Sequence, residues 1–321
     1  RIPIEVEPIT ANTRLTAIDD PATGPVTAAL PRPVGIRVTD AAGRPLPDIP
    51  VRWVALAGTA NARGTRTDSA GEARADWTLG RKAGMERLRV SVGSGRLVPP
   101  IDLMATATAG TPARLILAAG AGQRGNVGSV LPRAVAALVT DAEGNPVPGV
   151  SLRMTASAGH AADSVVTTDA KGIARTRWTL GERGGAMEFR FEVANAAVPL
   201  TATLHAIAFP GPAANISLVD PPKSPTTQTS LRIPARVTDA YGNSVPHAIV
   251  HVTTTLGHLA SKTIASDTAG QVTALWTLAA GSGDQVLTLR VGDAKATITM
   301  RRMPPLRPKP SAARHRAPDH Q

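Results

Sequence analysis

The chain has 321 residues, a formal net charge of +11 and no cysteine. Its length predicts two or three domains, and the absence of cysteine excludes a disulfide framework and thiolate metal sites. Only 2% of the residues are aromatic, so aliphatic side chains must fill any core, which suits the facing layers of a β-sandwich. No apolar run approaches the roughly 18–20 residues that a membrane-spanning helix needs.

The N-terminal stretch alternates Ile2, Ile4 and Val6 with polar residues and contains Pro3 and Pro8. This pattern predicts an extended arm or extra edge strand over residues 1–11. The first strand of a domain is expected just after it, near Arg14–Ile18.

One ten-residue pattern then occurs three times along the chain, at Val38–Pro47, Val139–Pro148 and Val237–Pro246. A second signature of the type Thr/Ser-Asp-x-x-Gly has its Asp 28 residues after the first Asp of each copy, and a Trp follows nine residues later. Fixed internal spacings of this kind predict three copies of one domain of roughly 100 residues.

Both acidic signatures predict tight turns, because an Asp side chain can accept bonds from nearby backbone amides and Gly tolerates a positive φ. The predicted turn residues are Asp40, Gly43, Asp141, Gly144, Asp239 and Gly242. Short runs of alternating apolar and polar residues lie between the turns, as in Val34–Val38, Ala73–Leu79, Leu88–Val92, Phe189–Val193 and Leu287–Val291. Such runs predict half-buried strands and an all-β fold of three tandem immunoglobulin-like β-sandwich domains in an elongated array.

The Trp of each copy lies in the middle of a predicted strand, and we expect it to fill the centre of its sandwich. These core residues are Trp77, Trp178 and Trp276. Trp53 has no counterpart in the other copies, where Met154 and Val252 stand, and is either a packing variant or an exposed contact residue.

Pro/Gly junctions at Ala109–Pro112 and Phe209–Pro212 separate the copies. They predict an arm at 1–11, domains at 12–109, 110–210 and 211–303, and a tail at 304–321. Short linkers that contain Pro restrict hinge motion, so a semi-rigid array on the order of 100 Å long is expected.

Residues that could carry chemistry are few. His160 and His258 share one turn position and belong to no cluster, and His247 and His251 lie too far apart on a strand to share a metal ion. Calcium would need a denser set of acidic ligands than the adjacent pair Asp19 and Asp20 provides. We therefore expect no enzyme activity, cofactor, metal site, small-molecule substrate or nucleic-acid ligand.

The pattern Val-Thr-Asp-Ala-x-Gly-Asn-Pro-Val-Pro, followed by Thr-Asp-x-x-Gly and the joint Ala105–Arg114, resembles the bacterial immunoglobulin-like group 1 domains of invasin and intimin type proteins. The resemblance covers roughly residues 12–303 and implies stalk modules without catalytic residues. The outer-membrane barrel and the lectin-like tip of that family are not present in this sequence.

The C-terminal stretch is basic and rich in Pro, and by composition it should be extended. Its candidate partner-binding residues are Arg301, Arg302, Arg307, Lys309, Arg314 and Arg316. Their charge favours acidic surfaces of protein subunits, with anionic membrane as a peripheral contact.

The chain begins with Arg1 rather than Met, which fits a removed export signal or an engineered start, so an extracytoplasmic location in the periplasm or on the cell surface is expected. The first functional hypothesis is a scaffold subunit that braces a larger, membrane-associated photosynthetic, respiratory or secretory assembly. The alternative is the stalk of a surface adhesin. A carbohydrate-binding module, using Trp53 or Tyr241, is a third possibility.

Overall fold

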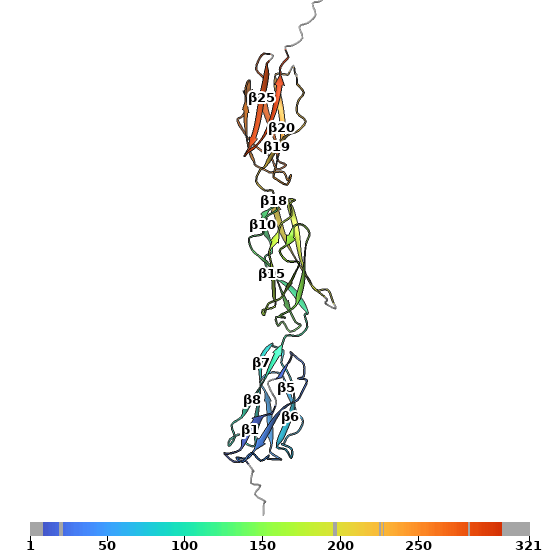
Figure 1. Cartoon of the computed structure of the whole chain (residues 1–321), viewed down its shortest axis with the longest axis vertical. Coiled ribbons are helices and arrows are strands. Elements are labelled where there is room, and N and C mark those ends of the chain that lie inside the picture. Colours follow the sequence, from blue (N-terminus) through green and yellow to red (C-terminus); the bar gives the residue numbers. More distant parts are fainter. Residues whose placement is uncertain are drawn as a thin grey trace, which may run out of the picture.

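The computed structural model describes residues 9–18, 22–194, 198–224, 226, 228–281 and 283–303. The described part contains strands, turns and bends but no helix, and therefore no helix that could cross a membrane. Figure 1 shows three β-sandwiches following one another along a single long axis. The prediction of three tandem immunoglobulin-like domains in an elongated array is confirmed.

The first domain packs two four-stranded sheets face to face, in the strand orders β1-β3-β6-β5 and β2-β8-β7-β4. Its strands are β1 (Arg14–Ala17), β2 (Ala22–Pro25), β3 (Val34–Thr39), β4 (Val51–Ala55), β5 (Thr59–Ala62), β6 (Glu72–Thr78), β7 (Gly84–Val92) and β8 (Ile101–Thr108). The short strand β2 runs parallel to β8, whereas the other pairs are antiparallel.

The second domain repeats this plan with a five-stranded sheet β10-β18-β17-β12-β14, a three-stranded sheet β15-β11-β9 and the pair β13-β16. Its strands are β9 (Arg114–Ala119), β10 (Gln123–Asn126), β11 (Val135–Thr140), β12 (Ser151–Ala156), β13 (His160–Ala161), β14 (Val165–Thr167), β15 (Ile173–Thr176), β16 (Trp178–Thr179), β17 (Gly185–Val193) and β18 (Thr201–Phe209).

The third domain has the sheets β19-β20-β24-β22 and β23-β21-β25-β26. Its strands are β19 (Asn215–Leu218), β20 (Ser230–Thr238), β21 (Ile249–Thr254), β22 (His258–Leu259), β23 (Thr263–Ala265), β24 (Gln271–Thr277), β25 (Asp284–Val291) and β26 (Ala294–Arg301). In place of the short parallel strand of the other two domains, a single parallel bridge joins Thr226 to Arg302.

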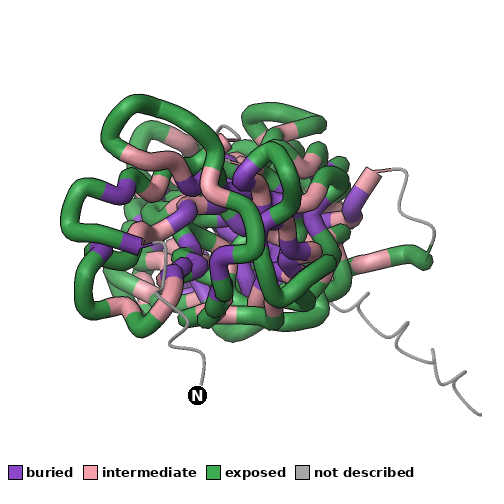
Figure 2. The backbone as a smooth tube through the Cα atoms, turned by 90° about the horizontal axis from the view of Figure 1, so that it is seen from below, coloured by how far each residue is buried: buried purple, intermediate pink, exposed green. Residues whose placement is uncertain are grey.

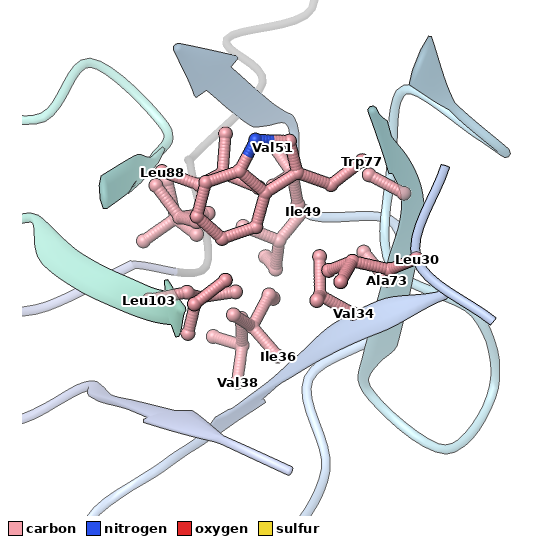
Figure 3. Close-up of a cluster of buried hydrophobic side chains, with 14 of the residues drawn as sticks. Leu30, Val34, Ile36, Val38, Ile49, Val51, Ala73, Trp77, Leu88 and Leu103 are labelled. Atoms are coloured by element: carbon pink, nitrogen blue, oxygen red, sulfur yellow. The ribbon is translucent and has the colours of Figure 1, made fainter. Parts of the chain in front are cut away.

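Each domain has its own core of alternating inward side chains, and the repeated Trp lies inside it. Trp77 and Trp178 are 0% exposed and Trp276 is 1% exposed. Figure 3 shows Trp77 packed among aliphatic side chains from both sheets, including Val51, Leu88 and Ile36. The indole N–H of each Trp donates to the carbonyl twenty residues earlier, that of Ala57, Ala158 or Leu256, so the buried donor is satisfied.

The buried and the exposed parts of the chain are arranged around the long axis of the molecule. Viewed along that axis, buried segments gather near the centre and exposed loops surround them (Figure 2). The predicted arm falls partly outside the described residues, but Ile9 is 6% exposed and belongs to the core of the first domain. Trp53 also packs against this core, and its indole nitrogen is buried without a hydrogen-bond partner.

Candidate functional site: the joints between domains

The first acidic signature of each copy folds into the same closed turn. The Oδ1 atom of Asp40 accepts the N–H groups of Ala42 and Arg44, both at 2.9 Å. Gly43 takes a φ of +81°, which a residue with a Cβ rarely adopts. Asp141 and Asp239 make the matching pair of bonds in the second and third copies, at 2.8 to 3.0 Å.

The second carboxylate oxygen has different partners in different copies. In the second copy, Asp141 Oδ2 accepts the N–H of Gly110, a linker residue, at 2.8 Å. In the third copy, Asp239 Oδ2 accepts the N–H of Gly211 at 2.9 Å. Each of the two turns is therefore hydrogen-bonded to the linker segment that leads into its domain.

An Asn four residues after the Asp then connects the turn to the preceding domain. Asn145 Nδ2 donates to Asp141 Oδ2 at 2.9 Å and to the Arg81 carbonyl at 2.8 Å, and its Oδ1 accepts the Ala83 N–H at 2.9 Å. Arg81 and Ala83 lie in the β6–β7 loop of the first domain. One side-chain amide therefore has all its hydrogen-bonding groups satisfied, with one donor bonded inside its own turn and the other donor and the acceptor bonded across the joint.

The joint between the second and third domains has the same construction. Asn243 Nδ2 donates to Asp239 Oδ2 at 2.9 Å and to the Glu182 carbonyl at 2.7 Å, while its Oδ1 accepts the Gly184 N–H at 3.0 Å. We call these two Asp–Asn pairs, with Gly110 and Gly211, the joint clamps. Each clamp places three residues, the Asp and Asn of one turn and the Gly of the linker, beside one loop of the preceding domain.

Burial and hydrogen bonding act in opposite directions on the clamp carboxylates. Asp141 is 2% exposed and Asp239 is 1% exposed. Burial alone opposes the ionised form of Asp141, but the bonds from Gly110, Asn145 and Glu143 outweigh it and hold its pKa below the usual 3.8. Burial likewise opposes ionisation of Asp239, and the bonds from Asn243, Gly211 and Tyr241 still lower its pKa.

The corresponding turn of the first domain lacks the Asn, because Arg44 occupies that position. Asp40 Oδ2 accepts the Arg44 Nε–H at 2.9 Å instead, and the Arg44 side chain is 80% exposed. The Arg44 backbone bond is the main reason that the pKa of Asp40 is lowered. Among the described residues, the hydrogen bonds to the Asp40 carboxylate come from this turn itself.

The two joints differ in one further contact, made by the residue two positions after the clamp Asp. At the first joint, Glu143 Oε2 lies 3.6 Å from Arg81 Nε. At the second joint, Tyr241 takes this position, and its ring lies so close to Gly128 that a Cβ there would be 2.5 Å from the Tyr241 hydroxyl oxygen. Gly128 corresponds to Thr27 of the first domain, so Gly makes room for the ring.

The second acidic signature serves the interior of each domain rather than the joints. Asp68, Asp169 and Asp267 close local turns through the N–H groups of the residues two and four positions later. The hydroxyl residue before each Asp is buried and bridges two backbone groups. Thr67, for example, accepts the Ile49 N–H and donates to the Leu46 carbonyl.

The predicted partner-binding residues are only partly within the described chain. Arg301 Nε pairs with Asp284 at 2.8 Å within its own domain, and Arg302 Nη2 donates to Thr229 at 3.4 Å. Arg307, Lys309, Arg314 and Arg316 lie outside the described residues. A partner-binding role for this set remains a prediction.

The residues weighed for metal binding are dispersed. His160 and His258 begin the short strands β13 and β22 and are exposed. Within the described residues, no group of three or more His, Asp or Glu side chains is arranged to hold a metal ion.

Sequence reasoning found the clamp Asp residues as turn formers but missed Asn145, Asn243, Gly110 and Gly211. A signal was present, because the clamp position holds Asn in two copies and Arg in the first. Taken together, the sandwiches and clamps define a linear array of immunoglobulin-like domains joined by hydrogen-bonded contacts.

Comparison with known proteins supports this class at the level of fold. No protein-family model and no curated protein sequence matches the chain. Among solved structures, FdeC, an adhesin of Escherichia coli, aligns with a TM-score of 0.53 and 21% identity over 91% of this chain and 98% of that chain. InvD of Yersinia pseudotuberculosis aligns with a TM-score of 0.55 and 14% identity over 91% of this chain and 97% of that chain. At these identities the likeness establishes the fold alone.

Proposed function

We propose that this chain is a non-catalytic, extracytoplasmic spacer, the stalk of a bacterial surface adhesin. The observation that carries the proposal is the pair of joint clamps. A spacer must keep its length, and each clamp bonds one domain to the next through a buried Asp and an Asn with all its polar groups satisfied.

The structural likeness to FdeC adds support, since that protein is described as an adhesin and aligns along nearly its whole length. Strand-based domains in series are well suited to the task, because each contacts only its neighbours and length grows with every copy. The basic charge of the chain is compatible with a site near an anionic cell surface.

The scaffold hypothesis remains the second candidate, and it depends on the ends of the chain as the contact sites. It has less support, because Arg301 is already paired with Asp284 inside the third domain.

The proposal is tested by measuring length and location. Small-angle scattering of the whole chain should give a maximum dimension on the order of 100 Å or more, with a profile that one extended conformer fits. In the native cell, an antibody against the third domain should label intact cells. A compact or multiply bent ensemble would refute the spacer, and stoichiometric co-purification with a periplasmic or inner-membrane assembly, without surface labelling, would favour the scaffold.

A further inference from the structure

The outer face of the second domain carries a row of apolar side chains. Ile116 on β9 lies directly opposite Leu138 on β11, which lies opposite Ile173 on β15. Their chain neighbours Leu115, Ala137 and Ala174 are buried in the core, so the three side chains point away from it. Ile116 is 51% exposed. We call Ile116, Leu138 and Ile173 the apolar row.

The sister domains have polar residues at the same three positions. In the first domain the row reads Thr16, Arg37 and Glu72, and the Arg and Glu form an ion pair. In the third domain it reads Ser217, Arg236 and Gln271. The fold therefore does not require apolar residues here, and a solvated outer face ordinarily excludes them.

Cationic side chains surround the apolar row. Arg114 precedes Ile116 by two positions on β9, and Lys171 and Arg175 lie two positions before and after Ile173; all three are exposed. Residues two apart on a strand share a face, so Arg114 and Arg175 border the row, and Lys171 lies in the turn just before β15. Asp169 is the acidic residue beside them, and it pairs with Arg175 at 3.5 Å.

The border therefore has an excess of positive charge around an apolar centre in which Ile116 is exposed and Leu138 and Ile173 are half-buried. A partner with an apolar centre and flanking carboxylates complements both features, whereas a second copy of this chain would bring cations against cations. Strand β9 is also the edge of its three-stranded sheet, so the row is open at the Ile116 end to an extended segment.

We propose that the apolar row, with Arg114, Lys171 and Arg175, binds an extended segment of another protein that has apolar residues at its centre and acidic residues at its ends. The apolar side chains of the segment pack on Ile116, Leu138 and Ile173, and its carboxylates reach the three cations. The second domain thus differs from its sisters in function as well as in sequence.

The test uses the whole chain and a synthetic peptide, Asp-Glu-Ile-Val-Leu-Ile-Glu-Asp, as the probe in a calorimetric titration. The decisive variant, I116T/L138R/I173E, copies the row of the first domain into the second. It leaves net charge unchanged, and the first domain already accommodates these residues, so folding is expected to persist; the unfolding transition verifies this. Val165→Thr is the matched control, because Val165 is 53% exposed on the other sheet of the same domain.

We expect the acidic peptide to bind the parent chain and Val165→Thr equally, and the row variant at least about tenfold more weakly, a loss of about 1.4 kcal/mol. Replacing Arg114, Lys171 and Arg175 by Gln should also weaken binding, and a peptide with Lys in place of Asp and Glu should not bind.

Four results would overturn the proposal. They are no binding of the acidic peptide, equal binding by the row variant, row-dependent dimerisation of the chain in sedimentation velocity, and row-dependent binding to phosphatidylglycerol vesicles in place of the peptide. The third would identify a second copy as the occupant, and the fourth a lipid surface.

Discussion

The turn at Asp40 and the turns at Asp141 and Asp239 share one backbone conformation but have different surroundings. All three Asp residues accept two amides of their own turn. In the described part of the chain, Asp141 and Asp239 also accept a linker amide, which Asp40 does not, and their turns carry an Asn that contacts the preceding domain. The same turn motif therefore also joins two domains when the residue four positions after the Asp is Asn, as in the second and third copies, and not Arg, as in the first.

Removing the carboxylate from a joint clamp should separate the two kinds of turn most clearly. Asp141→Ala leaves the amides of Gly110, Glu143 and Asn145 without their acceptor in a buried position. We expect the second domain to lose about 3 kcal/mol in its free energy of unfolding, measured by urea denaturation, because charged buried acceptors contribute most. Small-angle scattering should also show a population of molecules that are bent at the joint between the first and second domains.

The matched control is Asp40→Ala, which removes the same turn acceptor at a site where the described residues place no neighbouring domain. Its effect should be clearly smaller, and the shape of the chain should not change. Equal destabilisation by the two variants would mean that the joint adds nothing to the turn.

Acid should act on both joint clamps together. The pKa of Asp141 and of Asp239 is lowered on folding from the usual 3.8, so these groups stabilise the folded joints above that value, and the contribution is lost as pH falls through the lower folded pKa. We expect scattering profiles to be constant from pH 7 to about pH 4.5 and to broaden below about pH 3.5. The effect per joint should be smaller than that of Asp141→Ala, because a protonated carboxyl keeps its size and one carbonyl acceptor. Broadening between pH 7 and pH 5 would point to a different titrating group.

Replacing the clamp Asn with Arg, the residue at this position in the first domain, tests the contact between domains more selectively than removing the carboxylate does. Asn145→Arg removes the bonds to the Arg81 carbonyl and the Ala83 N–H but leaves the Asp141 turn bonds. We expect a loss of about 1–2 kcal/mol in the interaction between the first and second domains. Nuclear relaxation should then report faster, independent tumbling of these two domains.

The reverse exchange, Arg44→Asn, is the control for this variant. Asn can still cap the Asp40 turn, and the described chain places no preceding loop against it, so domain tumbling should not change. A change of tumbling in Arg44→Asn but not in Asn145→Arg would contradict the role of Asn145 in joining the first and second domains.

The sequence predicted the fold because the repeats fixed the register of turns and strands within each copy. The joints could not be predicted in the same way, since Asn145 and Asn243 bind backbone groups of residues more than sixty positions earlier. The change from Arg44 in the first copy to Asn145 and Asn243 in the others marks the position, but it does not say which residues the Asn contacts. The apolar row could not be predicted for a similar reason, because Ile116, Leu138 and Ile173 align only once the register of three strands is known.

The two joints should also differ slightly from each other in their response to salt. Glu143 and Arg81 face each other at 3.6 Å with the Arg side chain 84% exposed, so their attraction is screened by salt and contributes less than about 1 kcal/mol. Tyr241 meets Gly128 through a packed ring, which salt does not weaken. Raising NaCl to about 1 M, where the Debye length falls to roughly 3 Å, should therefore slightly loosen the first joint and leave the second unchanged. Glu143→Gln should abolish that salt dependence in relaxation measurements. If the second joint responds to salt as strongly as the first, the neutral Tyr241–Gly128 contact is not what distinguishes them.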